Sequence, residues 1–450
     1  MAVTFRVSSY SDPGGNYLSQ QTLVTTLIQA AGAQIGQYLS GNAVIDVAVT
    51  VDETISGSTI AQAGPTSLVT EGTLASGAKL MQTAAAAEIK TGVDPNGTTS
   101  EISVTLTRLF FNTASDYLGT DNSVPAGKFD AISVLTHEMT HGIAFTGYLQ
   151  NSDFSGNTVA RQSFYSDYDT MVASINSQPY FTGKVATIVY GSALPLTKTT
   201  SSSAIYHVDS TASSVLAHDL MAPVATNGAR VGLSDYDLAV YRDIGLPVTK
   251  TLSSPDGHTI VPGVGTQTVT GTTGLDTAVI LAARTGYTVA ASGISFILSG
   301  SMGVDTLTSV ERVTFSDNTG IALDISGNGG EAYRLYQAAL NRMPDQAGLG
   351  VQINALDKGT SLQTMAAGFI ASAEFNALYG SLTDSQYITQ LYANVLHRTP
   401  SAVELQYYQT NLNTHFSTRA DVLVGFSESP ENQANLIGVE QQGMYYVLAT

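Results

Sequence analysis

Apolar and polar positions follow two different periods in the first part of the chain. Residues 17–41 carry apolar side chains at helical spacing and end at a glycine, which predicts a helix. Residues 43–52 and 101–111 alternate between apolar and polar side chains, a pattern typical of half-buried strands. This part of the chain therefore predicts a mixed α/β segment.

Two further helices are predicted later in the same region. One begins at the acidic residue Asp130 and is expected to end near Gly147. The other covers residues 233–247, with Ser234 as N-cap. Residues 148–203 between them read as loop-rich, and we expect the specificity pocket of any site here to be built by loops within residues 148–206.

The pattern changes twice in the second half. Residues 258–328 form short β-like runs separated by glycines, and a helical pattern begins near residue 330. There, residues 335–345 and 391–401 share the pattern L-Y-x-x-x-L-x-R-x-P at an offset of 56. We predict a multidomain chain with an α+β domain (1–250), a β-rich linker module (251–328) and an all-α domain with an internal two-fold repeat (329–450).

Composition narrows the class of protein. The 450 residues carry a formal net charge of −18, only 12% are charged, and none is cysteine. Disulfides and thiolate metal sites are thereby excluded, and the absence of a basic patch argues against nucleic acid as a partner. No apolar run is long enough for a membrane span, and no N-terminal signal peptide is recognisable, so we expect either a cytoplasmic protein or export without such a signal.

The segment HEMTHGIAF carries the strongest chemical signal. His137 and His141 are four residues apart, which places them on one face of a helix, and Glu138 follows the first of them. Two such histidines can bind zinc, and the glutamate is then placed to take a proton from the bound water. The alternative interpretation is an exposed helix face without a metal.

A third ligand is needed, and the sequence restricts the candidates. A thermolysin-like glutamate is excluded because no glutamate follows Glu138 before residue 255. The compact pattern HExxHxxGxxH fails because residues 144 and 147 are alanine and glycine. Two histidines remain before the linker, His207 and His218.

HEMTHGIAF, a long insert, a lone histidine and then DLMAP resemble the leishmanolysin-type metzincins, and bacterial secreted relatives of that group in particular. The resemblance covers roughly residues 40–247. It implies a metzincin-like catalytic domain that hydrolyses peptide bonds of a protein or peptide substrate, with Glu138 as general base. It also implies zinc ligands His137, His141 and His207, and Met221 as the Met-turn residue. His218 stays the alternative third ligand.

One departure from that family motivates a second hypothesis. Ala144 stands where the family usually has a glycine, and glycine there permits a tight turn. The alternative function is therefore a catalytically weak or inactive surface- or matrix-binding protein on a metzincin scaffold.

The second half resembles modules of bacterial proteins that are exported by type I secretion or attached to surface layers. The resemblance is carried by GVDTLTSVERVTFSDNTGIALDISG and by AYRLYQAALNRMPDQAGL, the latter typical of an uncharacterised domain in such proteins. It implies a secreted, extracellular protein that contacts a cell surface or secretion machinery through residues 251–450. Calcium is a further candidate cofactor, with Asp276, Asp305 and Asp317 as ligands, although surface acids are usually just solvated.

Overall fold

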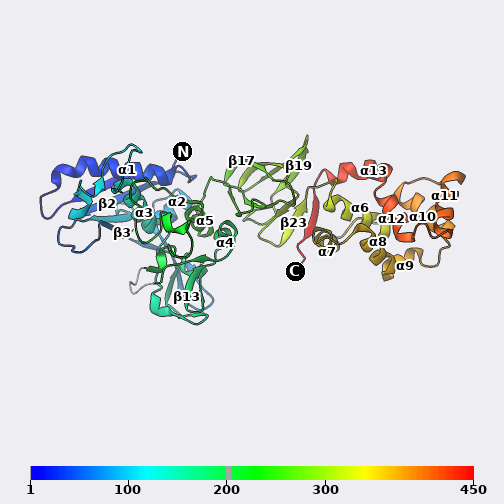
Figure 1. The fold of residues 1–450 in the computed structure, drawn as a ribbon, viewed down its shortest axis with the longest axis horizontal. Helices are drawn as coiled ribbons and strands as arrows, with labels where there is room; N and C mark the ends of the chain where they lie inside the picture. The colour runs from blue at the N-terminus through cyan, green and yellow to red at the C-terminus, as the bar shows by residue number, and fades with distance from the viewer. Residues whose placement is uncertain (1, 199–203, 450) are drawn as a thin grey trace. The chain divides into compact units, whose positions relative to one another are not determined.

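The computed structural model describes residues 2–198 and 204–449. The chain is multidomain and divides into two compact units, Met1–Pro255 and Asp256–Thr450. Unit 1 is mixed α/β, and unit 2 contains a β-rich part followed by helices (Figure 1). The sequence predicts three domains, whereas here the β-rich and helical parts share one unit.

The main sheet of unit 1 has the strand order β1-β2-β6-β3. The first three strands run parallel, and β3 lies antiparallel to β6 at the edge. The alternating residues of β2 bury every second side chain, as the sequence pattern predicts. The strands are β1 (Thr4–Ser11), β2 (Val44–Val51), β3 (Ala61–Pro65) and β6 (Ile102–Leu106).

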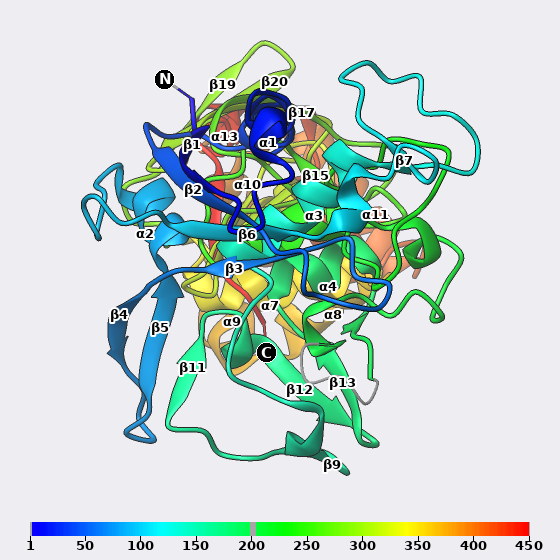
Figure 2. The same cartoon turned by 90° about the vertical axis from the view of Figure 1, so that its left-hand side faces the viewer.

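Two helices pack on this sheet and on each other (Figure 2). Helix α1 (Gln21–Gly36) lies beside β1, and α3 (Ala131–Ile143) lies beside β3 and β6. Helix α1 is shorter than the predicted residues 17–41, since a 3-10 turn, η1 (Leu18–Gln20), precedes it. Strand β6 is shorter than the predicted 101–111, because a second 3-10 turn, η2 (Arg108–Phe111), follows it.

The region predicted as loop-rich holds more regular structure than expected. A small antiparallel sheet has the order β12-β13-β14, and its strands are β12 (Val172–Ile175), β13 (Gln178–Phe181) and β14 (Leu194–Pro195). These strands are only two to four residues long, which explains why their pattern is weak in the sequence. The remaining elements of unit 1 include β4 (Leu68–Thr73), β5 (Lys79–Thr83), β11 (Phe164–Ser166), α2 (Ala84–Thr91), α4 (Lys184–Tyr190) and α5 (Asp235–Asp243).

Unit 2 begins with two sheets around an apolar core. One has the order β17-β21-β20-β19, and in the other β16, β18, β22, β23 and β24 follow one another. The strands are β16 (Thr259–Val261), β17 (Gly265–Thr270), β18 (Thr277–Val279), β19 (Thr288–Ser292), β20 (Ser295–Gly300), β21 (Gly303–Thr308), β22 (Arg312–Thr314), β23 (Thr319–Ala322) and β24 (Met444–Val447).

The helical part of unit 2 spans residues 328–440. Its helices are α6 (Asn328–Leu340), α7 (Gln346–Asp357), α8 (Leu362–Ala371), α9 (Ala373–Tyr379), α10 (Asp384–Val395), α11 (Ala402–Asn413), α12 (Arg419–Ser427) and α13 (Pro430–Glu440). The prediction of an all-α region over 329–450 is wrong at its end, because β24 pairs antiparallel with β23. Met444 and Tyr446 of this strand are buried. The end of the chain therefore pairs with the β-rich part because this pairing removes apolar surface from water.

The two similar sequence segments make similar contacts. Arg342 lies over the ring of Tyr336 and pairs with Glu374, and Arg398 lies over Tyr392 and pairs with Glu431.

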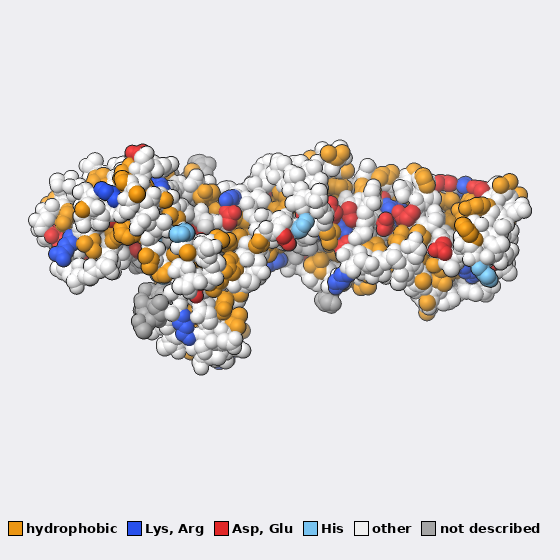
Figure 3. Space-filling view, in the orientation of Figure 1, with side chains coloured by type: hydrophobic (Ala, Val, Ile, Leu, Met, Phe, Trp, Pro, Cys, Tyr) orange, Lys and Arg blue, Asp and Glu red, His pale blue; other side chains and the backbone are white. Residues whose placement is uncertain are grey.

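Figure 3 shows few charged side chains on the face in view, as the low charged content predicts. Among the described residues, no helix is both long and apolar enough to cross a membrane.

Candidate metal centre

Helix α3 holds the histidine pair in a fixed frame. Its N-cap is Asp130, whose carboxylate accepts hydrogen bonds from the backbone N–H and the hydroxyl of Ser133 at 2.9 and 2.8 Å. The helical period then places His137 and His141 one turn apart on the same face. The sequence-predicted pair therefore lies on one side of a helix, and Asp130 is a buried cap.

The end of α3 differs from the prediction. The helix ends at Ile143, not near Gly147. The chain turns at Ala144, with φ −136° and ψ −52°, a conformation that does not require glycine. Gly147 is needed for another reason, because a Cβ there would lie 2.2 Å from a carboxylate oxygen of Asp169.

His207 is positioned by a short pairing with β14. The Thr197 N–H donates to the His207 carbonyl at 2.9 Å, and the Asp209 N–H donates to the Pro195 carbonyl at 2.9 Å. Tyr206, the preceding residue, is buried and donates to the Leu149 carbonyl at 3.0 Å. These bonds hold His207 opposite α3 although it follows His141 by 66 residues.

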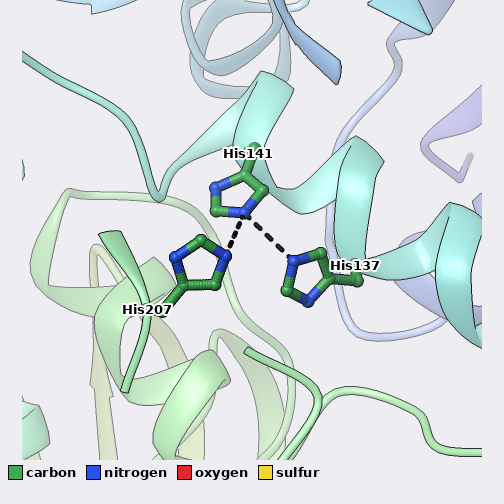
Figure 4. Close-up of side chains that lie close together, drawn as sticks. All are labelled: His137, His141 and His207. Atoms are coloured by element: carbon green, nitrogen blue, oxygen red, sulfur yellow. Dashed lines mark hydrogen bonds between the residues drawn. The ribbon is translucent and has the colours of Figure 1, made fainter. Parts of the chain in front are cut away.

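The three imidazoles converge on one point (Figure 4). The Nε2 atom of His141 lies 3.2 Å from that of His137 and 3.1 Å from that of His207. The Nδ1–H of His137 donates to the Leu220 carbonyl at 2.6 Å, and the Nδ1–H of His141 donates to the Phe145 carbonyl at 2.7 Å. With Nδ1 carrying the proton, the Nε2 lone pairs of these two rings face each other, an arrangement that a cation would stabilise.

Burial favours the neutral form of His137 and His141. It lowers the pKa of His137, and burial together with the charges of His137 and His207 lowers the pKa of His141 well below its ordinary value. Neutral imidazole is the form that binds a metal. The donor set, three imidazole nitrogens from one helix and one facing segment, fits a zinc ion with one further position open.

The turn before Pro223 connects the ligand segments. The Leu220 carbonyl accepts from His137, and the Met221 carbonyl accepts from the Val208 N–H at 3.0 Å. Met221 itself is fully buried, and its N–H donates to Asp219 at 2.9 Å. This turn therefore fixes the ring of His137 and the residue after His207 at once.

Glu138 lines the same cavity as His137 and His207. Burial raises its pKa to about 8, and a hydrogen bond from the Ala63 N–H on β3 opposes that rise. The carboxyl group is thus held between α3 and the edge strand, where it can exchange a proton with a group in the cavity.

The cavity has a volume of about 480 Å³ and is mainly apolar. Its walls come from the segment leading into β3, from α3 and from the loop after Met221. No described residue within 148–206 lines it, so the loops that were expected to build the pocket do not form this cavity. The main apolar residues are Ile60, Val134, Leu220, Pro223, Val224 and Val231.

Arg230 is a positioning residue that the sequence interpretation missed. Its guanidinium donates two bonds to Asp130, at 2.9 and 2.8 Å, and further bonds to the carbonyls of Gly119 and Thr120. The loop that closes the cavity is thereby tied to the N-cap of α3. A single basic residue in a loop carries no recognisable pattern, and only the spatial pairing identifies it.

The other predicted ligands lie elsewhere. His218 is exposed at the end of the 3-10 turn η6 (Leu216–His218) and is not part of the histidine cluster. Asp276, Asp305 and Asp317 belong to neither of the two metal-competent groups that the described residues form. Asp276 accepts from His258 and Thr272 instead. Calcium in the β-rich part therefore stays a sequence prediction.

Comparison with known proteins identifies only the helical part. The model of a domain of unknown function, DUF4214, matches residues 332–378 and 366–436. No curated protein and no solved structure matches the chain. Unit 1 is therefore interpreted from its own geometry.

Proposed function

We propose that unit 1 is a zinc-dependent endopeptidase with a metzincin-like site. The observation that carries the proposal is the convergence of three imidazole rings. In two of them the Nδ1–H donates to a backbone carbonyl, which leaves the Nε2 lone pair free for a metal. His137, His141 and His207 would hold the ion. When bound, zinc supplies a Lewis acid that polarises a peptide carbonyl and activates water.

Glu138 moves the proton in this proposal. It removes a proton from the attacking water and passes it to the leaving amine. The ionised carboxylate is required for the first step, and a neighbouring divalent cation favours that form over the protonated one. The Ala63 N–H holds the carboxyl group in place from β3.

The edge strand supports a peptide substrate. Strand β3 is the last strand of its sheet and lies beside α3, and the residues leading into it line the cavity. An extended chain can add to such an edge through backbone hydrogen bonds. The apolar cavity walls favour an apolar substrate side chain next to the cleaved bond.

The backbone at Ala144 removes the reason for the alternative function, an inactive binding protein. Its negative φ means that the missing family glycine is not needed for the turn after α3. The two functions remain separable by experiment.

The test compares wild type, Glu138→Gln and the charge-matched control Glu331→Gln, which lies on α6 in unit 2. Cleavage of casein and of a fluorogenic peptide library is measured together with zinc content by mass spectrometry. We expect about one zinc in all three proteins and a fall in kcat/KM of roughly 10²–10⁴ for Glu138→Gln alone. Equal cleavage by wild type and Glu138→Gln, or no zinc in the wild type, would overturn the proposal.

A further inference from the structure

Three carboxylates from separate segments of unit 1 meet away from the histidines. They are Glu88 on α2, Asp94 in the loop after it and Glu101 immediately before β6. One oxygen from each lies within 4.8 Å of the others. We propose that this acidic cluster is a calcium-binding site that joins α2, the 92–100 loop and the main sheet.

Burial distinguishes this cluster from ordinary surface acids. Glu88 is 6% exposed and Glu101 is 1% exposed. The Oε1 atom of Glu88 accepts from the Val44 N–H at 2.9 Å, but its Oε2 atom is buried and has no hydrogen-bond partner among the described residues. A buried carboxylate oxygen without a donor is costly, and a bound cation would satisfy it.

Charge around the cluster is not compensated by an ion pair. Among residues 2–198 and 204–449, no Lys or Arg forms a salt bridge with Glu88, Asp94 or Glu101. Arg6 donates two bonds of 2.7 Å to Asp46, and its positive charge offsets part of the negative charge of Glu88 and Glu101. Burial, with added repulsion from neighbouring acids, raises the pKa of both Glu88 and Glu101.

The loop positions the third carboxylate of the cluster, which is exposed. Asp94 accepts from the N–H groups of Asn96 and Gly97 at 2.9 and 2.7 Å, which folds the loop tightly beside the cluster. Carboxylate and amide oxygens are the ligands that Ca²⁺ takes.

Calcium fits this donor set better than other common divalent ions. All candidate donors are oxygens, which disfavours zinc and the softer metals. The donors come from a helix, a loop and a strand end, a flexible arrangement that suits the variable coordination of Ca²⁺ and not the near-ideal octahedron of Mg²⁺. The site is separate from the proposed zinc centre and does not depend on the peptidase proposal.

The experiment uses the full chain, freed of divalent ions, with one equivalent of zinc restored throughout. Calcium and, separately, magnesium are titrated by calorimetry, and amide exchange of residues 84–106 is followed with and without 5 mM calcium. The variants are Glu101→Gln and the more exposed Asp94→Asn. The control Asp317→Asn removes an acid that the sequence had suggested as a calcium ligand in unit 2.

We expect one calcium site in the wild type and in Asp317→Asn, with calcium slowing exchange at residues 84–106. Affinity should fall at least about tenfold in Glu101→Gln and Asp94→Asn. Without calcium, Glu101→Gln should melt at a higher temperature than wild type, because a charge is removed from the cluster. A purely structural role of Glu101 predicts a lower melting temperature.

Three outcomes would overturn the proposal. One is no calcium binding by the wild type up to 10 mM, which is roughly ten times the highest dissociation constant of extracellular calcium modules. Another is unchanged calcium affinity in both Glu101→Gln and Asp94→Asn, whatever the result for Asp317→Asn. The third is equal affinity for magnesium.

Discussion

Buried polar groups in unit 2 are paired with opposite charges, whereas at two places in unit 1 they are gathered with groups of their own kind. In unit 2, Arg334 is 2% exposed and pairs with Glu428 and Glu440, and Arg312 is 3% exposed and pairs with Asp324 and Asp357. In unit 1, groups of the same kind converge: three imidazoles at one place and three carboxylates at another.

The difference separates polar groups that hold the fold from polar groups that favour a ligand. Opposite charges brought together in the interior compensate each other's charge without a ligand. Like groups brought together are destabilised until a cation or proton lies between them. The second arrangement persists only where the surrounding fold holds it, as α3, β14 and the turn at Met221 do for the histidines.

The largest expected effect comes from removing one converging imidazole. His207→Ala should lose zinc and lower peptidase kcat/KM by at least about 10³-fold, since three protein ligands are the minimum of such a site. His218→Ala is the matched control and should retain both. Zinc content and peptide cleavage are measured on the two variants side by side; a loss in His218→Ala with retention in His207→Ala would reverse the ligand assignment.

Breaking a buried ion pair in unit 2 should lower the stability of that unit and leave zinc binding unchanged. Arg334→Leu leaves Glu428 and Glu440 without their shared cation, and we expect unit 2 to lose about 3–5 kcal/mol of unfolding free energy. Zinc content should stay unchanged. Guanidinium unfolding followed by fluorescence measures the loss, and a stability equal to wild type would show that the pairs are not needed for the fold.

A pH titration sharpens the same comparison. Burial raises the pKa of Glu440 to about 7 from an ordinary value of 4.5. The folded protein therefore holds this proton more tightly than the unfolded chain, so its contribution to stability is present below pH 4.5 and is lost as pH rises through 7. The unfolding free energy of unit 2 should fall by roughly 2–3 kcal/mol over that range.

Glu440→Gln should remove most of that slope, because the amide does not titrate. Urea unfolding of wild type and variant at several pH values between 4.5 and 8 provides the measurement. An identical slope in both proteins would assign the titration to other groups.

The smallest effect is expected at the turn after α3. Ala144→Gly introduces the residue that the related family usually has, but the φ of −136° is open to alanine. We expect a loss of only about 0.4–1 kcal/mol through greater freedom of the unfolded chain, with no gain in peptidase activity. A gain in activity would show that the family glycine matters for catalysis.

Local pattern was sufficient for some elements and misleading for others. Strand β2 and the N-cap Ser234 agree with the sequence prediction, because alternation and capping act over a few residues. The end of α3 was misplaced, because a hydrogen bond from His141 to the Phe145 carbonyl turns the chain before Gly147. Strand β24 was missed because its partner β23 lies more than a hundred residues earlier.

The sequence by itself determined that His137 and His141 share a helix face with Glu138 beside them, since helical spacing alone places them so. Only the tertiary structure decided that His207 joins them and His218 does not, because pairing with β14 and with the turn at Met221 sets the direction of that segment. The meeting of Glu88, Asp94 and Glu101 was decided in the same way. Contacts between distant segments have no period that a sequence can display.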